Sequence, residues 1–427
     1  MATPSRAAVA RALHLVFGEG QRVPEAWDAA LAPGDAGLAN ALLGLCLRRW
    51  GTLQAMVRPQ LREPARSLPL GTQVALAMGL SQLAWLPGVS DHASVNEAVD
   101  LATDRHLGFP PHKGLVNALL RRAARDRPAL AAALEAMDPA LDRTPFTERV
   151  LRCALAPRGG GPVQELWRRL QAPPRPCFRA LLEGPQPPWL EPAPESPDAL
   201  VLAPDAPFPA EWLARGAGMV QDLSSQALLD FNWDRPVTRV LDVCSAPGGK
   251  ATVLGRRFPA ARLTAVERSP ARAARLRENL RLRGVRCEVV VEDAGPWLRN
   301  ADQDFDLILL DAPCSGSGTL QKHPELNWLG DALDLPRLLR VQRDLLEAAL
   351  SRLAPGGLLL YAVCSWLPEE GHDHRERLQG WPRLRPVPVW PAPMGTEPGP
   401  TSFFLPDPLA WPGEGFQAFA FTLDPAG

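Results

Sequence analysis

The stretch "FDLILLDAPCSGSG", residues 305–318, decides the fold that we expect for the second half of the chain. Its apolar run is typical of a strand that is buried in a sheet. The run ends in Asp311, and a proline, Cys314 and small residues follow. A buried strand that ends in a carboxylate and a thiol indicates that functional side chains lie beyond its carboxyl end.

Strands alternate with helical segments on both sides of this stretch. We expect strands at residues 239–243, 262–267, 287–293, 305–311 and 357–364, and helices that include 269–284 and 335–353. This alternation predicts an α/β fold with a doubly wound, Rossmann-like sheet. Such sheets bind ligands beyond the carboxyl ends of their strands, so the residues at those ends are the candidates for a site.

The first of these strands is followed by "DVCSAPGGK", residues 242–250. Gly248 and Gly249 permit a tight turn and a close approach of the backbone to a ligand, at the start of a helix. A Walker loop would need glycine at Cys244 and Ser or Thr at Ala251, and the G-x-G-x-x-G pattern of dinucleotide-binding proteins is absent. The turn is therefore not a phosphate-binding loop of either kind.

Acidic residues end the next two strands. Glu267 stands about 20 residues after the glycines, where a carboxylate accepts hydrogen bonds from ribose hydroxyls. Asp293 ends the third strand, within reach of an adenine amino group. Taken singly, each acid is as often a helix cap as a ligand contact. Together with the glycine turn, they predict a nucleoside cofactor, and S-adenosylmethionine fits better than NAD.

Two cysteines, Cys314 and Cys364, end the fourth and fifth strands beside this cofactor. A single cysteine at a strand end is usually a packing residue. Cytosine C5 is too weak a nucleophile to take a methyl group until a thiolate has added at C6. Pro368 starts a short helix near Cys364, which favours the thiolate. Asp311 suits the N3 and N4 edge of cytosine, and Lys250 suits the charge there.

The first 130 residues predict an all-α domain, because apolar residues recur at helical spacing in five segments. These segments are residues 7–17, 37–50, 71–86, 93–102 and 113–127. Basic residues concentrate toward the end of this region: Arg105, Lys113, Arg121, Arg122, Arg125 and Arg127. Such a cluster is either a solvated helix face or a binding surface for phosphate groups. Lys322, one of only three lysines in the chain, is a further candidate for phosphate contact.

The segment between the two halves carries fourteen prolines from Pro157 to Pro209, which predicts a connecting region with short strands at most. We therefore divide the chain into a helical domain (1–135), a Pro-rich connecting subdomain (136–218) and a catalytic domain (219–427). The seven scattered cysteines form no C-x-x-C pair, which argues against a disulfide framework and a zinc ribbon and suits a reducing cytoplasm. His372 and His374 face different directions if they lie on a helix, so no metal is expected.

Three motifs, "CSAPGGK", "DAPCSGSG" with "KHPELNW", and "YAVCSWLPEEG", resemble those of the bacterial RNA cytosine-5 methyltransferases. In the helical region, "HASVNEAVDLA" and "KGLVNALLRR" resemble the NusB-like RNA-binding domain that is fused to the 16S ribosomal RNA branch, the Sun or Fmu type. The resemblance spans nearly the whole chain. It implies a NusB-like domain followed by a methyltransferase domain, with S-adenosylmethionine as cofactor.

The resemblance also implies roles for individual residues. Cys364 would be the nucleophile, Cys314 would assist product release, and Asp311 and Lys250 would serve the base. The cofactor residues would be Cys244, Ser245, Ala246, Pro247, Gly248, Gly249, Lys250, Glu267, Asp293 and Asp311. The RNA-binding residues would be Lys113, Arg121, Arg122, Arg125 and Lys322. The expected partner is RNA, foremost 16S ribosomal RNA, with no membrane partner and with the enzyme as a cytoplasmic monomer.

One rival assignment makes Cys314 the nucleophile, because DNA cytosine-5 methyltransferases use the cysteine of a Pro-Cys pair and Pro313-Cys314 has that form. Cys364 decides against it, since the DNA enzymes do not need a second thiol at a strand end. Two alternatives concern the function. The substrate could be transfer RNA instead of ribosomal RNA. The chain could also be a non-catalytic RNA-binding assembly factor, although the presence of both cysteines, Asp311 and Lys250 argues against this.

Overall fold

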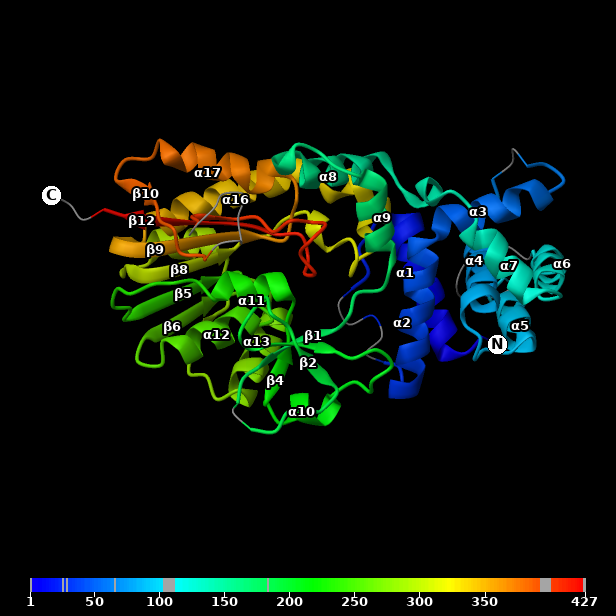
Figure 1. Ribbon diagram of the computed structural model, residues 1–427, viewed down its shortest axis with the longest axis horizontal. Coiled ribbons are helices and arrows are strands. Elements are labelled where there is room, and N and C mark those ends of the chain that lie inside the picture. Colours follow the sequence, from blue (N-terminus) through cyan, green and yellow to red (C-terminus); the bar gives the residue numbers. More distant parts are fainter. Residues whose placement is uncertain are drawn as a thin grey trace. The chain divides into compact units, whose positions relative to one another are not determined.

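The computed structural model describes residues 2–24, 27, 30–64, 67–102, 112–182, 184–391 and 401–424. They form two compact units (Figure 1). The helical unit contains Met1–Arg149, Arg168–Pro173 and Leu320–Leu333, and the α/β unit contains Val150–Trp167, Pro174–Thr319 and Asp334–Gly427. Among the described residues, no helix is long and apolar enough to cross a membrane.

The helical unit is built around α4 (Leu70–Trp85), which is buried on nearly all sides. A helix that is apolar all round belongs in the interior of a bundle. The helices that pack on α4 are α1 (Pro4–Glu19), α2 (Pro33–Arg48), α3 (Trp50–Val57), α5 (Asp91–Leu101), α6 (Lys113–Ala123) and α7 (Arg127–Glu135). The expected all-α domain is confirmed.

The segment Leu320–Leu333 belongs to the helical unit although it follows the fourth predicted strand in sequence. It holds the short helix α15 (Leu326–Leu329). The indole Nε1 of Trp328 donates to the carbonyl of Leu47 at 2.6 Å, and the backbone N–H of Thr144 donates to Asn327 Oδ1 at 3.2 Å. Sequence analysis placed this segment with the catalytic domain and did not foresee that it packs on helices.

The α/β unit contains an eight-stranded sheet in the order β10-β12-β9-β8-β5-β6-β7, with β11 paired to β12. Strands β5 to β9 are parallel, and β12 runs antiparallel to β9. The strands are β5 (Arg239–Val243), β6 (Arg262–Val266), β7 (Glu288–Val290), β8 (Phe305–Asp311), β9 (Leu353–Val363), β10 (Leu384–Pro386), β11 (Phe403–Phe404) and β12 (Gln417–Leu423). The expected Rossmann-like α/β fold is confirmed.

Helices cover both faces of this sheet, as the nearly continuous apolar strands require. Helices α12 (Gly249–Arg257) and α13 (Pro270–Leu282) cover one face, and α14 (Ala294–Asn300), α16 (Leu335–Leu350) and α17 (His372–Gln379) cover the other (Figure 1). Alternate residues of β8 point to the two cores: Leu307 and Leu309 to the first, Ile308 and Leu310 to the second. The sheet is therefore rigid where its strands end.

The Pro-rich segment forms more structure than expected. It contributes helix α9 (Val163–Gln171), which follows α8 (Pro145–Leu155) in the chain, and three of the four strands of an antiparallel sheet in the order β2-β3-β1-β4. Those strands are β1 (Cys177–Ala180), β2 (Leu190–Pro192), β3 (Ala199–Leu202) and β4 (Gly218–Val220). The expectation of short strands at most is wrong for α9, which directly follows Pro162, where a missing backbone N–H costs no helical bond.

The division at residues 135 and 218 differs from the compact units. Residues 136–149 pack with the helical unit, and residues 150–167 and 174–218 pack with the α/β unit. The three-part division of the chain stays a prediction about independent folding.

Candidate active site

The candidate site lies at the carboxyl ends of β5, β8 and β9, which are neighbours in the sheet. The strand order reverses between β8 and β5, since β6 and β7 continue on one side and β9 and β12 on the other. Loops that leave adjacent strands in opposite directions open a crevice at such a point. Residues 244–248, Cys314 and Cys364 all lie in loops at this edge, and α12 begins at Gly249.

The loop after β5 makes the tight turn that sequence analysis predicted. Gly248 has φ +101°, a conformation that side-chain-bearing residues rarely adopt. A Cβ atom there would lie 2.6 Å from Leu276 Cδ1 of α13. The absence of a side chain thus lets α12 begin close to α13. Cys244 also has a positive φ, +61°.

The predicted cofactor acids differ in their surroundings. Glu267 follows β6 with a side chain that is 3% exposed, and its Oε1 accepts a hydrogen bond from the backbone N–H of Ser269 at 2.9 Å. Arg272 Nη1 lies 3.5 Å from Glu267 Oε2. Asp293 is exposed and caps α14 by accepting from the N–H of Gly295 at 3.1 Å. The capping alternative is thus realised for Asp293.

Asp242, within β5, was not singled out by sequence analysis as a site residue. It is fully buried, and Ser245 Oγ donates to its Oδ2 at 2.6 Å. Its Oδ1 has no hydrogen-bond partner among the described residues. Burial, and then the charge of Asp311, raise the pKa of Asp242 to about 7. A buried polar atom without a partner at the edge of the sheet points toward a ligand that supplies a donor.

Carboxylates surround Cys244, which follows β5. Burial and then the negative charges of Asp311, Glu267 and Asp242 raise the pKa of this thiol to about 12. The three acids therefore converge on one place, as the sequence predicted for Glu267 and Asp311. A thiol with so high a pKa keeps its proton near neutral pH, so Cys244 is a poor nucleophile.

Lys250 and Asp311 form an ion pair across the point where the strand order reverses. Lys250 Nζ, in the first turn of α12, lies 2.7 Å from Asp311 Oδ2 at the end of β8. Burial acts to lower the pKa of Lys250, but the charges of Asp311, Cys364 and Asp242 outweigh it, so that its pKa is raised. The structure thus brings together two of the predicted catalytic residues and places the ammonium within the electrostatic reach of Cys364.

The two predicted catalytic cysteines are in contact. Cys314 Sγ and Cys364 Sγ lie 3.4 Å apart, and both cysteines are free thiols. The hydrogen bond to Cys364, followed by burial, raises the pKa of Cys314 well above its ordinary value. Cys314 therefore keeps its proton at neutral pH, and either sulfur can be the donor in this contact. The two free thiols form a partly buried, hydrogen-bonded pair.

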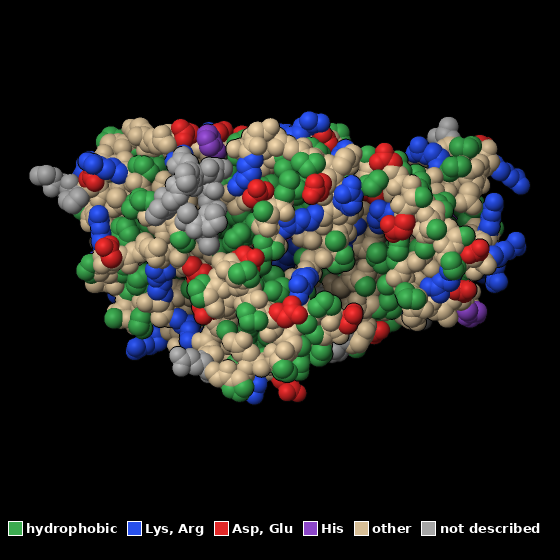
Figure 2. Space-filling model, in the orientation of Figure 1, with side chains coloured by type: hydrophobic (Ala, Val, Ile, Leu, Met, Phe, Trp, Pro, Cys, Tyr) green, Lys and Arg blue, Asp and Glu red, His purple; other side chains and the backbone are tan. Residues whose placement is uncertain are grey.

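The predicted RNA-binding residues all belong to the helical unit. Lys113, Arg121, Arg122, Arg125 and Lys322 are exposed. Figure 2 shows Lys and Arg side chains where α6 reaches the surface. Arg127 behaves differently, because its guanidinium donates to the carbonyls of Gln82, Leu83, Leu86 and Val89 around the C-terminal end of α4. The Arg127 guanidinium is therefore engaged within the helical unit. Arg105 lies outside the described residues.

Two tryptophans in the family motifs, Trp328 and Trp366, are packed inside the protein. Trp328 lies 5.6 Å, between ring centroids, from Phe17, and Trp366 is only 5% exposed. His374 is buried, its Nε2 hydrogen bonds to Gln342 Oε1, and burial lowers its pKa to about 4. Among the described residues, no three His, Cys, Asp or Glu side chains are grouped as a metal would require.

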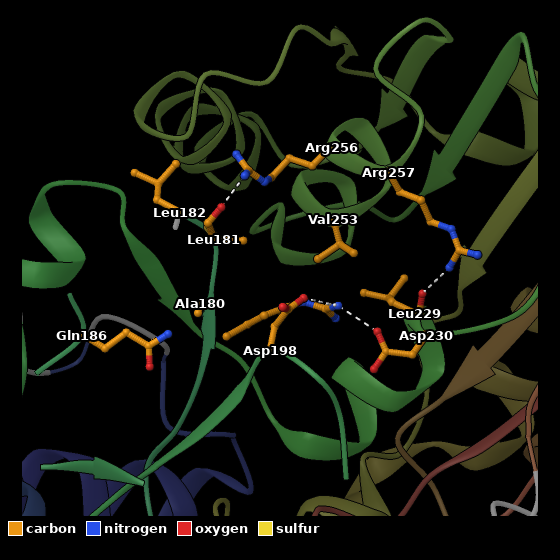
Figure 3. Close-up of a pocket in the computed structure, with 11 residues that line it drawn as sticks. Ala180, Leu181, Leu182, Gln186, Asp198, Leu229, Asp230, Val253, Arg256 and Arg257 are labelled. Carbon is orange, nitrogen blue, oxygen red and sulfur yellow. Dashed lines mark hydrogen bonds and ion pairs between the residues drawn. The ribbon is translucent and has the colours of Figure 1, made fainter. Parts of the chain in front are cut away.

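A cavity of about 680 Å³ lies at the other end of α12 (Figure 3). Arginines line it, but each is engaged by the protein. Arg179 bridges Asp198 and Asp230, Arg256 donates to the Leu181 carbonyl, and Arg257 donates to the Leu229 carbonyl at the end of α11 (Leu223–Leu229). This cavity is separate from the crevice at the carboxyl edge of the sheet, where the predicted site residues gather.

Known proteins resemble this chain over most of its length. Residues 233–403 match the family 16S rRNA methyltransferase RsmB/F, and residues 3–125 match the NusB family. Ribosomal RNA small subunit methyltransferase B of Vibrio cholerae is 32% identical over 386 residues, which cover 86% of each chain. The protein of the same name from Salmonella typhi is 30% identical and covers 86% of this chain and 88% of its own.

Solved structures share the fold. The protein PH0851 superposes with a TM-score of 0.73 at 19% identity and covers 99% of each chain. NSun6 of Pyrococcus horikoshii, solved with SFG, superposes with a TM-score of 0.52 at 16% identity and covers 66% of this chain and 99% of its own. The glycine turn, the buried Glu267 and the unpartnered Asp242 oxygen fit S-adenosylmethionine as the cofactor. With this site on a NusB-like and Rossmann-like framework, the chain belongs to the RsmB/F family of S-adenosylmethionine-dependent ribosomal RNA methyltransferases.

Proposed function

We propose that this enzyme methylates C5 of a cytosine in 16S ribosomal RNA through a covalent adduct between Cys364 and C6 of the base. The observation that carries the proposal is the contact of 3.4 Å between the sulfurs of Cys314 and Cys364, on the edge of the sheet where the Lys250–Asp311 pair lies. A methylation at an exocyclic nitrogen or a ribose oxygen would need no thiol, whereas C5 methylation needs a nucleophile at C6.

Cys364 is the better nucleophile of the two. With Cys314 as the donor of the sulfur–sulfur contact, the Cys364 sulfur accepts a hydrogen bond, and it also lies in the positive field of Lys250. A sulfur next to a hydrogen-bond donor and a cation is the stronger nucleophile. Addition of this sulfur to C6 makes C5 electron-rich. S-adenosylmethionine, held by the turn at residues 244–249 and by Glu267, supplies the methyl group to C5.

Cys314 serves the second half of the reaction. After methyl transfer, C5 gives its proton to water as the base, and the electron pair of the C5–H bond forms the C5–C6 double bond and expels Cys364 from C6 as a thiolate. A leaving thiolate is stabilised by a hydrogen-bond donor, and the protonated Cys314 is in contact with the sulfur that leaves. Its position therefore suits the release of the product.

Asp311 and Lys250 are the residues that we propose to read the base. The carboxylate suits the N4 amino group of cytosine, and the ammonium suits the charge that builds up at the N3 and O2 edge. Asp311 is about one-third exposed, so a base that has left its stack can reach it. An unpaired or locally opened RNA segment is the expected substrate.

RNA containing 5-fluorocytidine tests the assignment, because fluorine at C5 prevents release of the adduct. Wild type and Cys314→Ala should form a covalent complex that resists denaturing electrophoresis, and Cys364→Ala should form none. If Cys364→Ala still traps RNA and Cys314→Ala does not, the two roles are reversed, as in the Pro-Cys arrangement. Binding without methyl transfer from labelled cofactor would favour a non-catalytic assembly factor.

Methyl transfer from labelled cofactor to 16S ribosomal RNA and to transfer RNA, both taken from cells that lack the enzyme, tests the substrate. We expect transfer to the ribosomal RNA, with Lys113, Arg121, Arg122, Arg125 and Lys322 contacting phosphate groups. Methylation of transfer RNA alone would overturn the assignment of the substrate.

We further propose that the enzyme acts in the cytoplasm as a monomer. Light scattering of the purified protein checks the oligomeric state.

A further inference from the structure

A buried carboxylate lies behind the two cysteines. Glu370, in the short 3₁₀ helix Pro368–Glu370, is fully buried in the α/β unit. Its Oε1 accepts from the backbone N–H of Ser315 at 2.8 Å and from Gln342 Nε2 at 3.0 Å. Its Oε2 accepts from the hydroxyls of Ser315 at 2.5 Å and Ser365 at 2.6 Å. Four donors thus surround one carboxylate.

These bonds connect the two loops that carry the thiols. Ser315 directly follows Cys314, and Ser365 directly follows Cys364. Ser317 strengthens the connection, because its hydroxyl lies 2.8 Å from Ser365 Oγ and accepts from the N–H of Trp366 at 3.1 Å. The carboxylate of Glu370 is therefore the shared acceptor for the residue that follows each cysteine.

The backbone of Glu370 is held in place by the core of the sheet. The hydroxyl of Tyr361, a buried residue of β9, donates to the Glu370 carbonyl at 2.8 Å, and the Tyr361 ring stacks on Phe419 of β12 with centroids 4.6 Å apart. Glu370 therefore transmits the position of the rigid sheet to the two loops.

Gln342 of α16 supports the other side of the carboxylate. Its Nε2 donates both to Glu370 Oε1 and to the carbonyl of Pro313, the residue before Cys314, at 2.9 Å. These two acceptors fix the orientation of the amide, so that its Oε1 accepts from His374 Nε2 at 3.0 Å. Both neighbours of Cys314 in the chain are therefore held by the network around Glu370.

We propose that Glu370 is a positioning residue for the two thiols: its carboxylate holds the loops after β8 and β9 so that Cys314 and Cys364 stay in sulfur–sulfur contact. The inference rests on the proposed function, in which that contact stabilises the nucleophile and the leaving sulfur. Glu370 touches neither base nor cofactor. Burying a carboxylate raises the free energy of the folded state unless donors surround it, and apolar side chains in the same space would stabilise the fold at least as well. The carboxylate is therefore better explained by its hydrogen bonds, which fix the positions of the two loops.

The test compares Glu370→Gln, Glu370→Ala and an exposed control, Glu376→Gln on α17. The first variant keeps the shape of the side chain, the second removes all four bonds, and the control makes the same acid-to-amide change outside the network. Because distorted positioning commonly costs one to two orders of magnitude in rate, we expect kcat for methyl transfer to fall about a hundredfold in Glu370→Ala and about tenfold in Glu370→Gln. The KM for RNA and cofactor should stay within about threefold, since neither ligand loses a contact.

A second readout measures the thiol contact without catalysis. Diamide takes up two electrons and two protons from a pair of thiols, which become a disulfide, and is itself reduced to the hydrazine. Peptide mapping by mass spectrometry gives the rate at which the Cys314–Cys364 disulfide forms. We expect this rate to fall at least fivefold in Glu370→Ala and to stay at the wild-type value in Glu376→Gln, because the reaction requires the sulfurs to meet. Ser315→Ala and Ser365→Ala, which remove single hydroxyls, should give smaller losses in both assays even if Glu370→Ala does not fold.

The outcomes separate this inference from the proposed function. If wild type forms no adduct on fluorocytidine RNA, the proposed function fails, whatever the Glu370 variants do. If wild type traps RNA but the folded Glu370 and serine variants keep the wild-type kcat and the wild-type rate of disulfide formation, the positioning role is overturned. A rise in KM at unchanged kcat would also overturn it, because it would assign Glu370 to ligand binding.

Discussion

The sulfurs of Cys314 and Cys364 meet at 3.4 Å although 50 residues separate the two cysteines in the chain. The contact follows from the pairing of β8 with β9, whose parallel alignment brings Asp311 opposite Ala362 at their carboxyl ends. Beyond the strands, the N–H of Gly318 donates to the carbonyl of Cys364 at 3.1 Å, so the two loops continue side by side. A register shift of one residue would turn one thiol into the other face of the sheet.

Replacing Asp311 by Asn should change the pH dependence of catalysis. In wild type, the charge of Asp311 helps to raise the pKa of Lys250 against the effect of burial. Without that charge, burial dominates and the pKa of Lys250 falls. We expect kcat to drop at least tenfold at neutral pH and to decline further at alkaline pH, where the ammonium loses its proton. The pH profile of kcat measures this, with the exposed Asp302→Asn as control. A profile for Asp311→Asn with the same alkaline limb as wild type would contradict the role of the pair.

Arg127 and Arg122 should behave oppositely when each is replaced by alanine. Arg127 donates to four carbonyls around the end of α4 and forms an ion pair with Asp91 at 3.0 Å. Its loss should destabilise the helical unit by about 2 kcal/mol, because buried acceptors lose a charged donor. Arg122 is exposed on α6, and its loss should weaken RNA binding and reduce the slope of log K against log salt by about 1. Thermal unfolding and salt titration of RNA binding distinguish the two variants. An unchanged salt slope in Arg122→Ala would show that Arg122 is not part of the RNA interface.

Trp328 provides a test of packing against base stacking. Its indole donates to the Leu47 carbonyl at 2.6 Å and packs near Phe17 in the helical unit. Trp328→Phe should cost about 1 kcal/mol for the lost hydrogen bond, and Trp328→Ala about 2–3 kcal/mol for the lost packing as well. Thermal unfolding measures both changes. A large loss of RNA affinity in Trp328→Ala, at unchanged stability, would instead assign the ring to a base.

The sequence predicted the parts of the fold that depend on local pattern. Strands β5 and β8 have the expected bounds, because each is a short apolar run whose ends are marked by charged or polar residues. The meeting of the two cysteines was also predictable, since parallel neighbours end at the same edge. Short strands were expected in the Pro-rich segment, but their pairing into the antiparallel sheet β1–β4 was not, because strands of three or four residues between prolines carry too little pattern to indicate their partners.

Long-range burial was the part that the sequence did not reveal. Nothing in "KHPELNW" indicates that Trp328 packs on α2, and nothing in "RDRPALA" indicates that Arg127 caps α4. Asp242 and Glu370 look like ordinary acids until their complete burial is seen. The only sequence signal for Glu370 is its place in "PEEG", six residues after Cys364. Which acids are buried is decided by tertiary packing.

Asp242 makes the stability of the α/β unit depend on pH. Burial raises its pKa to about 7, from 3.8 for an exposed group. Between these two values the native state holds a proton that the unfolded chain releases, so the free energy of unfolding contributed by Asp242 falls as the pH rises from 4 to 7. Asp242→Asn, which keeps an acceptor for Ser245, should therefore match wild type near pH 4 and become more stable than it above pH 7, by at most about 4 kcal/mol. Urea unfolding of the cofactor-free enzyme at several pH values, followed by pulsed hydrogen exchange in β5, measures the difference, and the exposed Asp302→Asn controls for net charge. A stability difference between Asp242→Asn and wild type that does not vary from pH 4 to pH 8 would show that Asp242 is ionised throughout.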